Sequence, residues 1–168
     1  MNVDQLAESL RSDPMFMQNV VRWYVLPARP AVYEPFPDSL DPRLLPVLEK
    51  RGVHQLYRHQ AHAIREVLAG RDVVVVTPTA SGKTMCYNLP VLSAILQNDD
   101  ARALYLFPTK ALSADQVSEL YDLIEAMGVD IKTYTYDGDT PGAARKAVRQ
   151  ALSICVVSSS RETVYASL

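Results

Sequence analysis

Apolar and polar residues along this chain follow two periods, one typical of strands and one typical of helices. After residue 70 the two periods take turns, so that short apolar segments alternate with longer segments of helical spacing. This alternation predicts an α/β domain in which helices cover both faces of a parallel sheet. The predicted strands are 72–77, 103–107, 131–136 and 153–157, and the predicted helices are 41–52, 58–68, 83–97, 111–127 and 140–152.

The first 40 residues follow a different pattern. One short helix is predicted at 3–10, and a second starts at Asp13-Pro14 and runs to Val21. Prolines then accumulate, and they favour an extended, irregular segment because proline fixes φ and supplies no N–H. We therefore expect an N-terminal arm at 1–40, an α/β domain at 41–157 and a tail at 158–168.

The segment Thr77–Thr84 lies between the first predicted sheet strand and a predicted helix. A strand, a loop of small residues and a helix opening on Gly-Lys-Thr are the parts of a phosphate-binding loop. Free N–H groups at a helix start favour an anion, and Gly82 lets the backbone approach it closely. Lys83 can then reach the β- and γ-phosphates of a nucleotide, and the Thr84 hydroxyl can ligate Mg²⁺.

The segment departs from the usual phosphate-loop pattern at its start. Thr77 stands where the pattern opens with glycine, and Ala80 stands where glycine is frequent. The plainer alternative is a surface turn with a chance Gly-Lys-Thr. The strand before the loop and the helix after it favour the phosphate-binding interpretation.

Composition narrows the class of protein. The 168 residues are 48% hydrophobic and 21% charged, as expected for one globular domain. A net charge of −2 gives no overall attraction to nucleic acid, so any such binding needs a local patch. Cys86 and Cys155 are expected to be reduced and buried. No apolar run has transmembrane length and no signal peptide is evident, so we expect a cytoplasmic protein without membrane contact.

Three histidines, His54, His59 and His62, raise the question of a metal site. His59 and His62 are three residues apart on a predicted helix. No cysteine or acidic residue is spaced to complete a coordination shell with them. A solvated or capping role is therefore expected for these side chains.

Four stretches, taken in order, resemble the first motor domain of the superfamily 2 DEAD/DEAH-box-like helicases. Leu56–Gln60 resembles the Q motif, Thr77–Thr84 resembles motif I, and Pro108–Leu112 resembles motif Ia. Tyr136–Thr140 stands where the family has a small loop that contacts nucleic acid. The sequences of these motifs are most similar to those of the YprA-type bacterial DNA-repair helicases. The resemblance covers about Pro27 to Val157. Thr in place of the first loop glycine is common in this family.

The resemblance implies an ATP-binding domain of the RecA-like fold, with ATP and Mg²⁺ as cofactors and nucleic acid, DNA in the first place, as partner. It implies that Gln60 reads the adenine edge, because its amide carries both donors and acceptors. Tyr57, one turn earlier, is expected to pack in the core. The remaining expected contacts are Thr79, Ala80, Ser81, Gly82, Lys83 and Thr84 for phosphate, Thr84 also for Mg²⁺, and Pro108, Thr109, Lys110 and Gly138 for nucleic acid.

Two parts of the family's machinery have no match in this sequence. No apolar run is followed by the paired acids that hold Mg²⁺ and orient the attacking water, and the second motor domain with its arginines is absent. The match also stops after Val157. We therefore interpret the chain as the N-terminal portion of a helicase ATP-binding domain, as a truncated reading frame would produce. We expect it not to hydrolyse ATP at a helicase rate by itself.

Two alternatives stay open at this point. One is a different P-loop ATPase or a nucleotide kinase, against which Gln60 and Pro108–Lys110 argue. The other is a non-enzymatic remnant that binds nucleotide or DNA without turnover.

Overall fold

The computed structural model describes residues 2–27, 30–78, 80–136 and 154–158. By its internal contacts the chain divides into two compact units, Met1–Ala31 and Val32–Leu168. The helix predicted at 140–152 and nearly all of the tail predicted at 158–168 lie outside the described residues.

The first unit holds two short helices, α1 (Val3–Ser12) and α2 (Pro14–Met17). Asn2 caps α1: its side chain accepts the Gln5 N–H, and the Gln5 side chain accepts the Asn2 N–H. The second helix ends at Met17 and not at Val21 as predicted. After Met17 the backbone N–H groups of Asn19 and Val20 donate to the carbonyls three residues earlier, so the chain continues as a tight turn and not as an α-helix.

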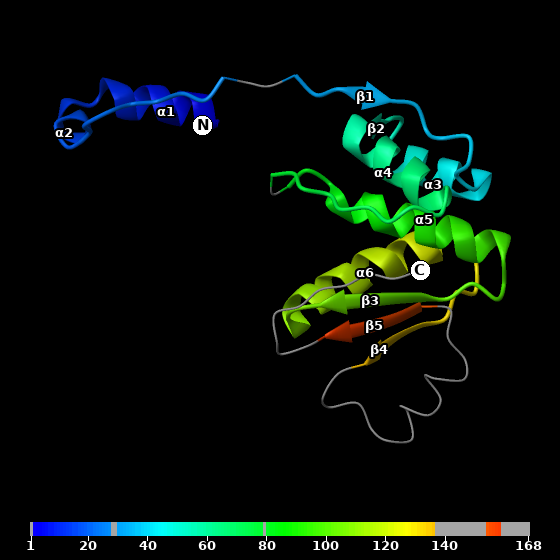
Figure 1. Cartoon of the computed structure of the whole chain (residues 1–168). Helices are drawn as coiled ribbons and strands as arrows, with labels where there is room; N and C mark the ends of the chain where they lie inside the picture. The colour runs from blue at the N-terminus through cyan, green and yellow to red at the C-terminus, as the bar shows by residue number, and fades with distance from the viewer. Residues whose placement is uncertain (1, 28–29, 79, 137–153, 159–168) are drawn as a thin grey trace. The chain divides into compact units, whose positions relative to one another are not determined.

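The second unit is built on a three-stranded parallel sheet (Figure 1). Its strands are β3 (Ala103–Phe107), β4 (Thr133–Tyr136) and β5 (Ile154–Ser158), in the order β3-β5-β4. Helix α6 (Lys110–Met127) connects β3 to β4 and packs on β3 and β5. The parallel α/β arrangement confirms the predicted fold class and places the carboxyl ends of all three strands at one edge.

Alternate residues of β3 explain why helices cover this sheet. Ala103, Tyr105 and Phe107 are buried, whereas Leu104 is 39% exposed on the other face. The Tyr105 hydroxyl donates to Oδ1 of Asn88, 3.0 Å away on helix α5 (Lys83–Gln97), so α5 is also joined to the sheet.

A second layer of helices packs on α5. In this layer α4 (Arg58–Leu68) packs directly on α5, and η1 (Pro42–Leu44) is joined to α5 by the Arg43 side chain, which donates to the Leu96 carbonyl. Helix α3 (Leu45–Lys50) follows η1 and contacts α6. Strands β1 (Tyr33–Glu34) and β2 (Leu56–Tyr57) form a small antiparallel ladder beside α4. Fully buried leucines and isoleucines connect these layers into one core: Leu44, Leu48, Leu56, Ile64, Leu89, Leu92 and Ile154.

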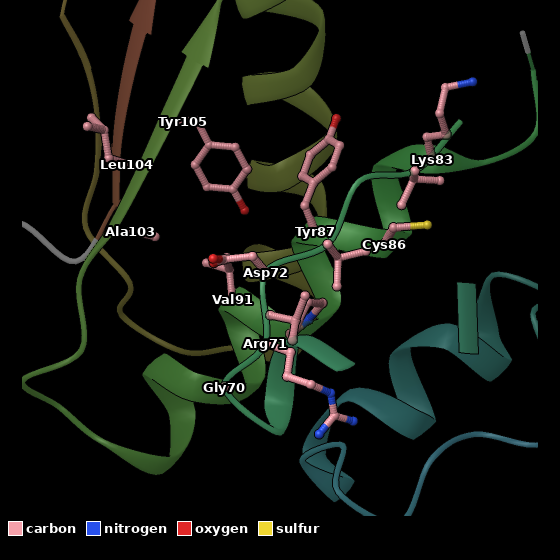
Figure 2. A pocket seen from close by; sticks show the side chains of 14 residues that line it. Gly70, Arg71, Asp72, Lys83, Cys86, Tyr87, Val91, Ala103, Leu104 and Tyr105 are labelled. Carbon is pink, nitrogen blue, oxygen red and sulfur yellow. The ribbon is translucent and has the colours of Figure 1, made fainter. Parts of the chain in front are cut away.

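The strand predicted at 72–77 is wrong, because this segment forms no strand. Val74 and Val76 are 89% and 90% exposed, and a cavity of about 490 Å³ lies between Val73 and Val75 on one side and β3 on the other (Figure 2). Without a hydrogen-bonded neighbour among the described residues, the valines cannot form a ladder. Their apolar side chains are therefore not enclosed, despite a sequence typical of a buried strand.

Two further sequence predictions can be compared with the structure. Cys86 and Cys155 are free and buried, as expected. Burial raises the pKa of the Cys86 thiol to about 11 and also raises the pKa of Cys155, so both thiols stay protonated and unreactive at neutral pH. Among the described residues, none of the helices is both long and apolar enough to cross a bilayer.

Candidate functional site

The loop 77–84 leads from the exposed valine segment into helix α5. Two of its residues have positive φ, Ala80 at 60° and Gly82 at 70°, and Gly82 is the N-cap of α5. A left-handed N-cap turns the chain abruptly, which is where glycine is favoured. No side chain caps the first turn of α5 in the described structure, so its N–H groups are not occupied in that way. Thr79 lies outside the described residues.

Lys83 reaches back across this loop. Its ammonium donates to the carbonyl oxygens of Thr77 (2.9 Å) and Pro78 (2.8 Å), and it lies 3.4 Å from the Ser81 hydroxyl. The Thr77 and Ser81 hydroxyls are 2.6 Å apart. Thr77, which replaces the usual glycine, thus adds a cross-loop hydrogen bond that glycine cannot make. Thr77 therefore stabilises the loop, although it departs from the usual phosphate-loop pattern.

Helix α4 holds the other side of the loop. Gln60 is 3% exposed, and its Nε2 donates to the Gly82 carbonyl (2.8 Å) while its Oε1 accepts the Tyr57 N–H (2.9 Å). Nε2 of His59 lies 3.0 Å from the Ser81 carbonyl oxygen. Two consecutive loop carbonyls are therefore bound by two consecutive residues of α4. The solvated or capping role expected for His59 is wrong, because the ring is half-buried against the loop.

Tyr57 does not pack in the core as expected. Its side chain is 37% exposed and lies between two other rings, Tyr33 at 5.0 Å and His59 at 5.8 Å between centroids. The reason is the β1–β2 ladder, which pairs Tyr33 with Tyr57 and places both rings on the same face. The result is a short aromatic stack at the surface, continuous with the residues that hold the loop.

Thr84 is contacted from the sheet side by a residue that the motifs did not single out. The Thr84 hydroxyl donates to Oε1 of Gln116 on α6, 3.2 Å away, and the Tyr87 hydroxyl donates to the same oxygen. Gln116 comes seven positions after Thr109, in a stretch that sequence reasoning treated only as an amphipathic helix.

The predicted nucleic-acid contacts lie where β3 enters α6. Thr109 is the N-cap of α6, and its hydroxyl accepts the Leu112 N–H at 3.3 Å. Pro108 is half-buried and Lys110 is exposed in the first turn. The pairs Phe107–Ser158 and Tyr136–Val157 are in register, so β4 ends at the same sheet edge where α6 begins. Gly138, which follows β4, lies outside the described residues.

The cavity of Figure 2 is separate from these contacts. Its walls come from the valine segment, α5 and β3, with the rings of Tyr87 and Tyr105 edge to face at 5.7 Å. Lys83 borders it, yet the ammonium points away from the other lining side chains (Figure 2). The valine side chains offer no hydrogen-bond donors, and the Arg71 guanidinium in the lining is already paired with Glu66. The loop 77–84, and not this cavity, is therefore the candidate phosphate site.

Known proteins share both the sequence and the fold. The chain is 53% identical over 147 residues to an ATP-dependent helicase of Bacillus subtilis, YprA, an alignment that covers 88% of this chain and 20% of that protein. It also superposes on the crystal structure of the DUF1998 helicase MrfA bound to DNA and AMPPNP, with a TM-score of 0.84 and 49% identity over 94% of this chain and 22% of MrfA. The chain thus spans about a fifth of the length of these relatives.

A more distant structure shows the fold alone. The Mycobacterium smegmatis helicase Lhr, bound to ssDNA and AMP-PNP, matches 72% of this chain with a TM-score of 0.63 and 21% identity. The sheet and its helices are thus those of the RecA-like helicase fold. The model of the DEAD/DEAH box helicases matches residues 57–165, from the second ring of the aromatic stack to beyond β5. This match decides between the families that the sequence left open: the chain belongs to the DEAD/DEAH box helicases.

Proposed function

We propose that the loop 77–84 binds the triphosphate of ATP together with Mg²⁺, and that the start of α6 binds a nucleic-acid strand, DNA in the first place. These would be the two binding functions of an ATP-driven helicase or translocase, acting in the cytoplasm. The observation that carries the proposal is the placement of the Lys83 ammonium inside a loop that α4 holds in shape.

The phosphate half of the proposal follows from the donors at the loop. The first turn of α5 has no side-chain cap, so its N–H groups and the helix dipole favour an anion there. Lys83 now donates to two neutral carbonyls. A phosphate oxygen carries a negative charge, so it adds a coulombic attraction to the ammonium that a carbonyl oxygen lacks. We infer that phosphate takes over this ammonium, with Thr79, Ala80, Ser81 and Gly82 forming the surrounding loop.

Thr84 is the residue in this loop that fits Mg²⁺. Its hydroxyl is an oxygen ligand of the hard type that Mg²⁺ requires, and its proton is directed away to Gln116. Mg²⁺ held by Thr84 would neutralise part of the charge of the bound phosphates. The protein's own contribution is to hold the Thr84 oxygen and the Lys83 ammonium on adjacent residues of α5.

The proposed recognition of adenine rests on Gln60 and the aromatic stack. An amide side chain has two donor hydrogens and two acceptor lone pairs, and the contacts to Gly82 and Tyr57 use one of each. We propose that the second pair reads the adenine edge while the first pair holds the loop. The Tyr57 ring lies beside it between Tyr33 and His59, so a base would extend this aromatic stack at one of its ends.

The nucleic-acid half rests on the N-terminus of α6. Thr109 caps this helix, and the first-turn N–H groups and Lys110 are at the sheet edge where β4 also ends. Pro108 precedes Thr109 and completes the described part of the proposed surface, and we propose Gly138 as a further contact from its sequence position. MrfA, of which this chain matches 22%, is bound to DNA and AMPPNP in its crystal structure, which supports proposing both kinds of ligand here.

Lys110→Gln is expected to weaken binding of single-stranded DNA to a similar extent for every sequence. A lysine that contacts a phosphate releases about one counterion, so the slope of log K against log[salt] should fall by about 0.7. Fluorescence anisotropy with a labelled oligonucleotide at several salt concentrations measures this slope. Lys132→Gln is the matched control, because Lys132 is exposed and precedes β4 at the opposite sheet edge. An equal loss for both variants would contradict the proposed surface.

A further inference from the structure

Gln116 joins two helices at the metal side of the proposed nucleotide site. It is half-buried on α6, and its Oε1 accepts hydrogen bonds from both Thr84 and Tyr87 of α5. Thr84 and Tyr87 are three residues apart, so their hydroxyls lie on one face of α5. One amide oxygen thus receives two hydroxyl protons from successive turns of the neighbouring helix.

The direction of these hydrogen bonds matters for metal binding. A threonine hydroxyl has one proton and two lone pairs, and Thr84 gives its proton to Gln116. The bond to Gln116 therefore does not use the lone pairs of the Thr84 oxygen, which are the electrons that bind a cation. Groups that hydrogen-bond a metal ligand typically set its orientation, and their loss costs about 10- to 100-fold in metal affinity.

Tyr87 keeps the amide in place. Its hydroxyl occupies the second acceptor position of the Gln116 oxygen, and its ring packs edge to face on Tyr105 of β3. Gln116 therefore has a fixed partner on one side and the Thr84 hydroxyl on the other.

We propose that Gln116 is a positioning residue that orients the Thr84 hydroxyl as a ligand for nucleotide-bound Mg²⁺. The inference rests on the proposed function of the loop 77–84 and adds a residue that none of the loop motifs contains. Gln116 then contributes to the Mg²⁺-dependent part of nucleotide affinity and leaves the Mg²⁺-independent part unchanged.

The test is AMPPNP binding to the 168-residue chain, by titration calorimetry, with Mg²⁺ and with EDTA. For Gln116→Leu, which keeps the volume and removes the acceptor, we expect the gain in affinity from Mg²⁺ to fall about 10- to 100-fold. Affinity in EDTA should not change. Gln116→Glu should restore the gain, because a carboxylate accepts both hydroxyl protons. Ser118→Ala, an exposed change on the same helix, should behave as the unsubstituted chain.

A double-mutant cycle with Thr84→Ala separates positioning from a general structural effect. If Gln116 acts through Thr84, then Gln116→Leu should cause no further loss of the Mg²⁺ gain once Thr84 is alanine. A full Mg²⁺ gain in Gln116→Leu, or equal losses with Mg²⁺ and with EDTA, would overturn the inference and leave the proposed function intact. Failure of the unsubstituted chain to bind AMPPNP in either buffer would overturn both.

Discussion

Lys83→Ala is expected to weaken ATP binding by about 100-fold while leaving the fold intact. Hydrogen bonds to charged groups are worth roughly 1.5–3 kcal/mol each, and the Lys83 ammonium is placed to make at least one of them with phosphate. Its present partners are carbonyls of a partly exposed loop, so their loss opens no cavity in the core. Calorimetric titration with ATP and Mg²⁺, beside a thermal melt, measures both quantities.

Lys50→Ala is the control for Lys83→Ala. Lys50 is exposed at the end of α3. Its replacement by alanine removes the same charge from a surface outside the loop 77–84. A general effect of net charge on an anionic ligand would weaken binding in both variants alike. Equal affinity in Lys83→Ala and the unsubstituted chain would show that the loop is a turn and not a phosphate site.

Gly82→Ala is expected to abolish nucleotide binding and to lower the melting temperature. Gly82 has φ of +70°, and a Cβ built there lies 2.5 Å from Nε2 of Gln60, which itself is hydrogen-bonded to the Gly82 carbonyl. The left-handed conformation alone costs a non-glycine residue about 1–2 kcal/mol. The contact with a buried amide adds to it, because the Gln60 side chain must leave the loop or the loop must move away from α4.

Gly70→Ala isolates the second effect. Gly70 has nearly the same conformation, with φ of +77°, but nothing lies within 4 Å of its Cβ. The two variants share the backbone cost and differ in the collision with Gln60. Thermal melts should therefore show a larger decrease in melting temperature for Gly82→Ala. Only that variant should lose its affinity for ATP. Identical melting temperatures and ATP affinities in the two variants would mean that Gln60 does not hold the loop.

The elements predicted best are those with strong local signals. Helix α6 was predicted at 111–127 and is found at Lys110–Met127, with Thr109 as N-cap and Gly128 in the left-handed conformation after its last turn. The N-cap residue, the apolar stripe and the terminating glycine all lie within or next to this segment, so its prediction needs no tertiary information. The strands β3 and β5 agree with prediction to within one residue for the same reason.

The valine segment shows why local pattern fails in a sheet. A run of valines indicates a strand that is buried on both faces, yet burial depends on what lies next to it. Here the neighbouring space is a cavity bordered by Tyr105 and Leu104, and Val74 and Val76 face solvent. Neighbours in a parallel sheet are distant in sequence, so composition alone does not reveal whether they are present.

The residues of the candidate site were predicted where they are contiguous in sequence and missed where only the fold brings them together. Gly82, Lys83 and Thr84 are contiguous, and the motif placed them at a loop–helix junction that the structure confirms. His59 and Gln116 were missed because their partners are 22 and 32 residues away in sequence. A single hydrogen bond between distant residues leaves no periodic signal. The position of His59 directly before Gln60 was the one hint the sequence offered.

The most direct test of the phosphate site is a map of backbone amide shifts in ¹H–¹⁵N spectra of the chain as AMPPNP and Mg²⁺ are added. We expect the largest shifts at residues 80–85 and smaller shifts at His59, Gln60 and Gln116. The same titration of Lys83→Ala should leave residues 80–85 unshifted. Saturable nucleotide binding that shifts other amides and leaves 80–85 unchanged in the unsubstituted chain would contradict the assignment of this loop.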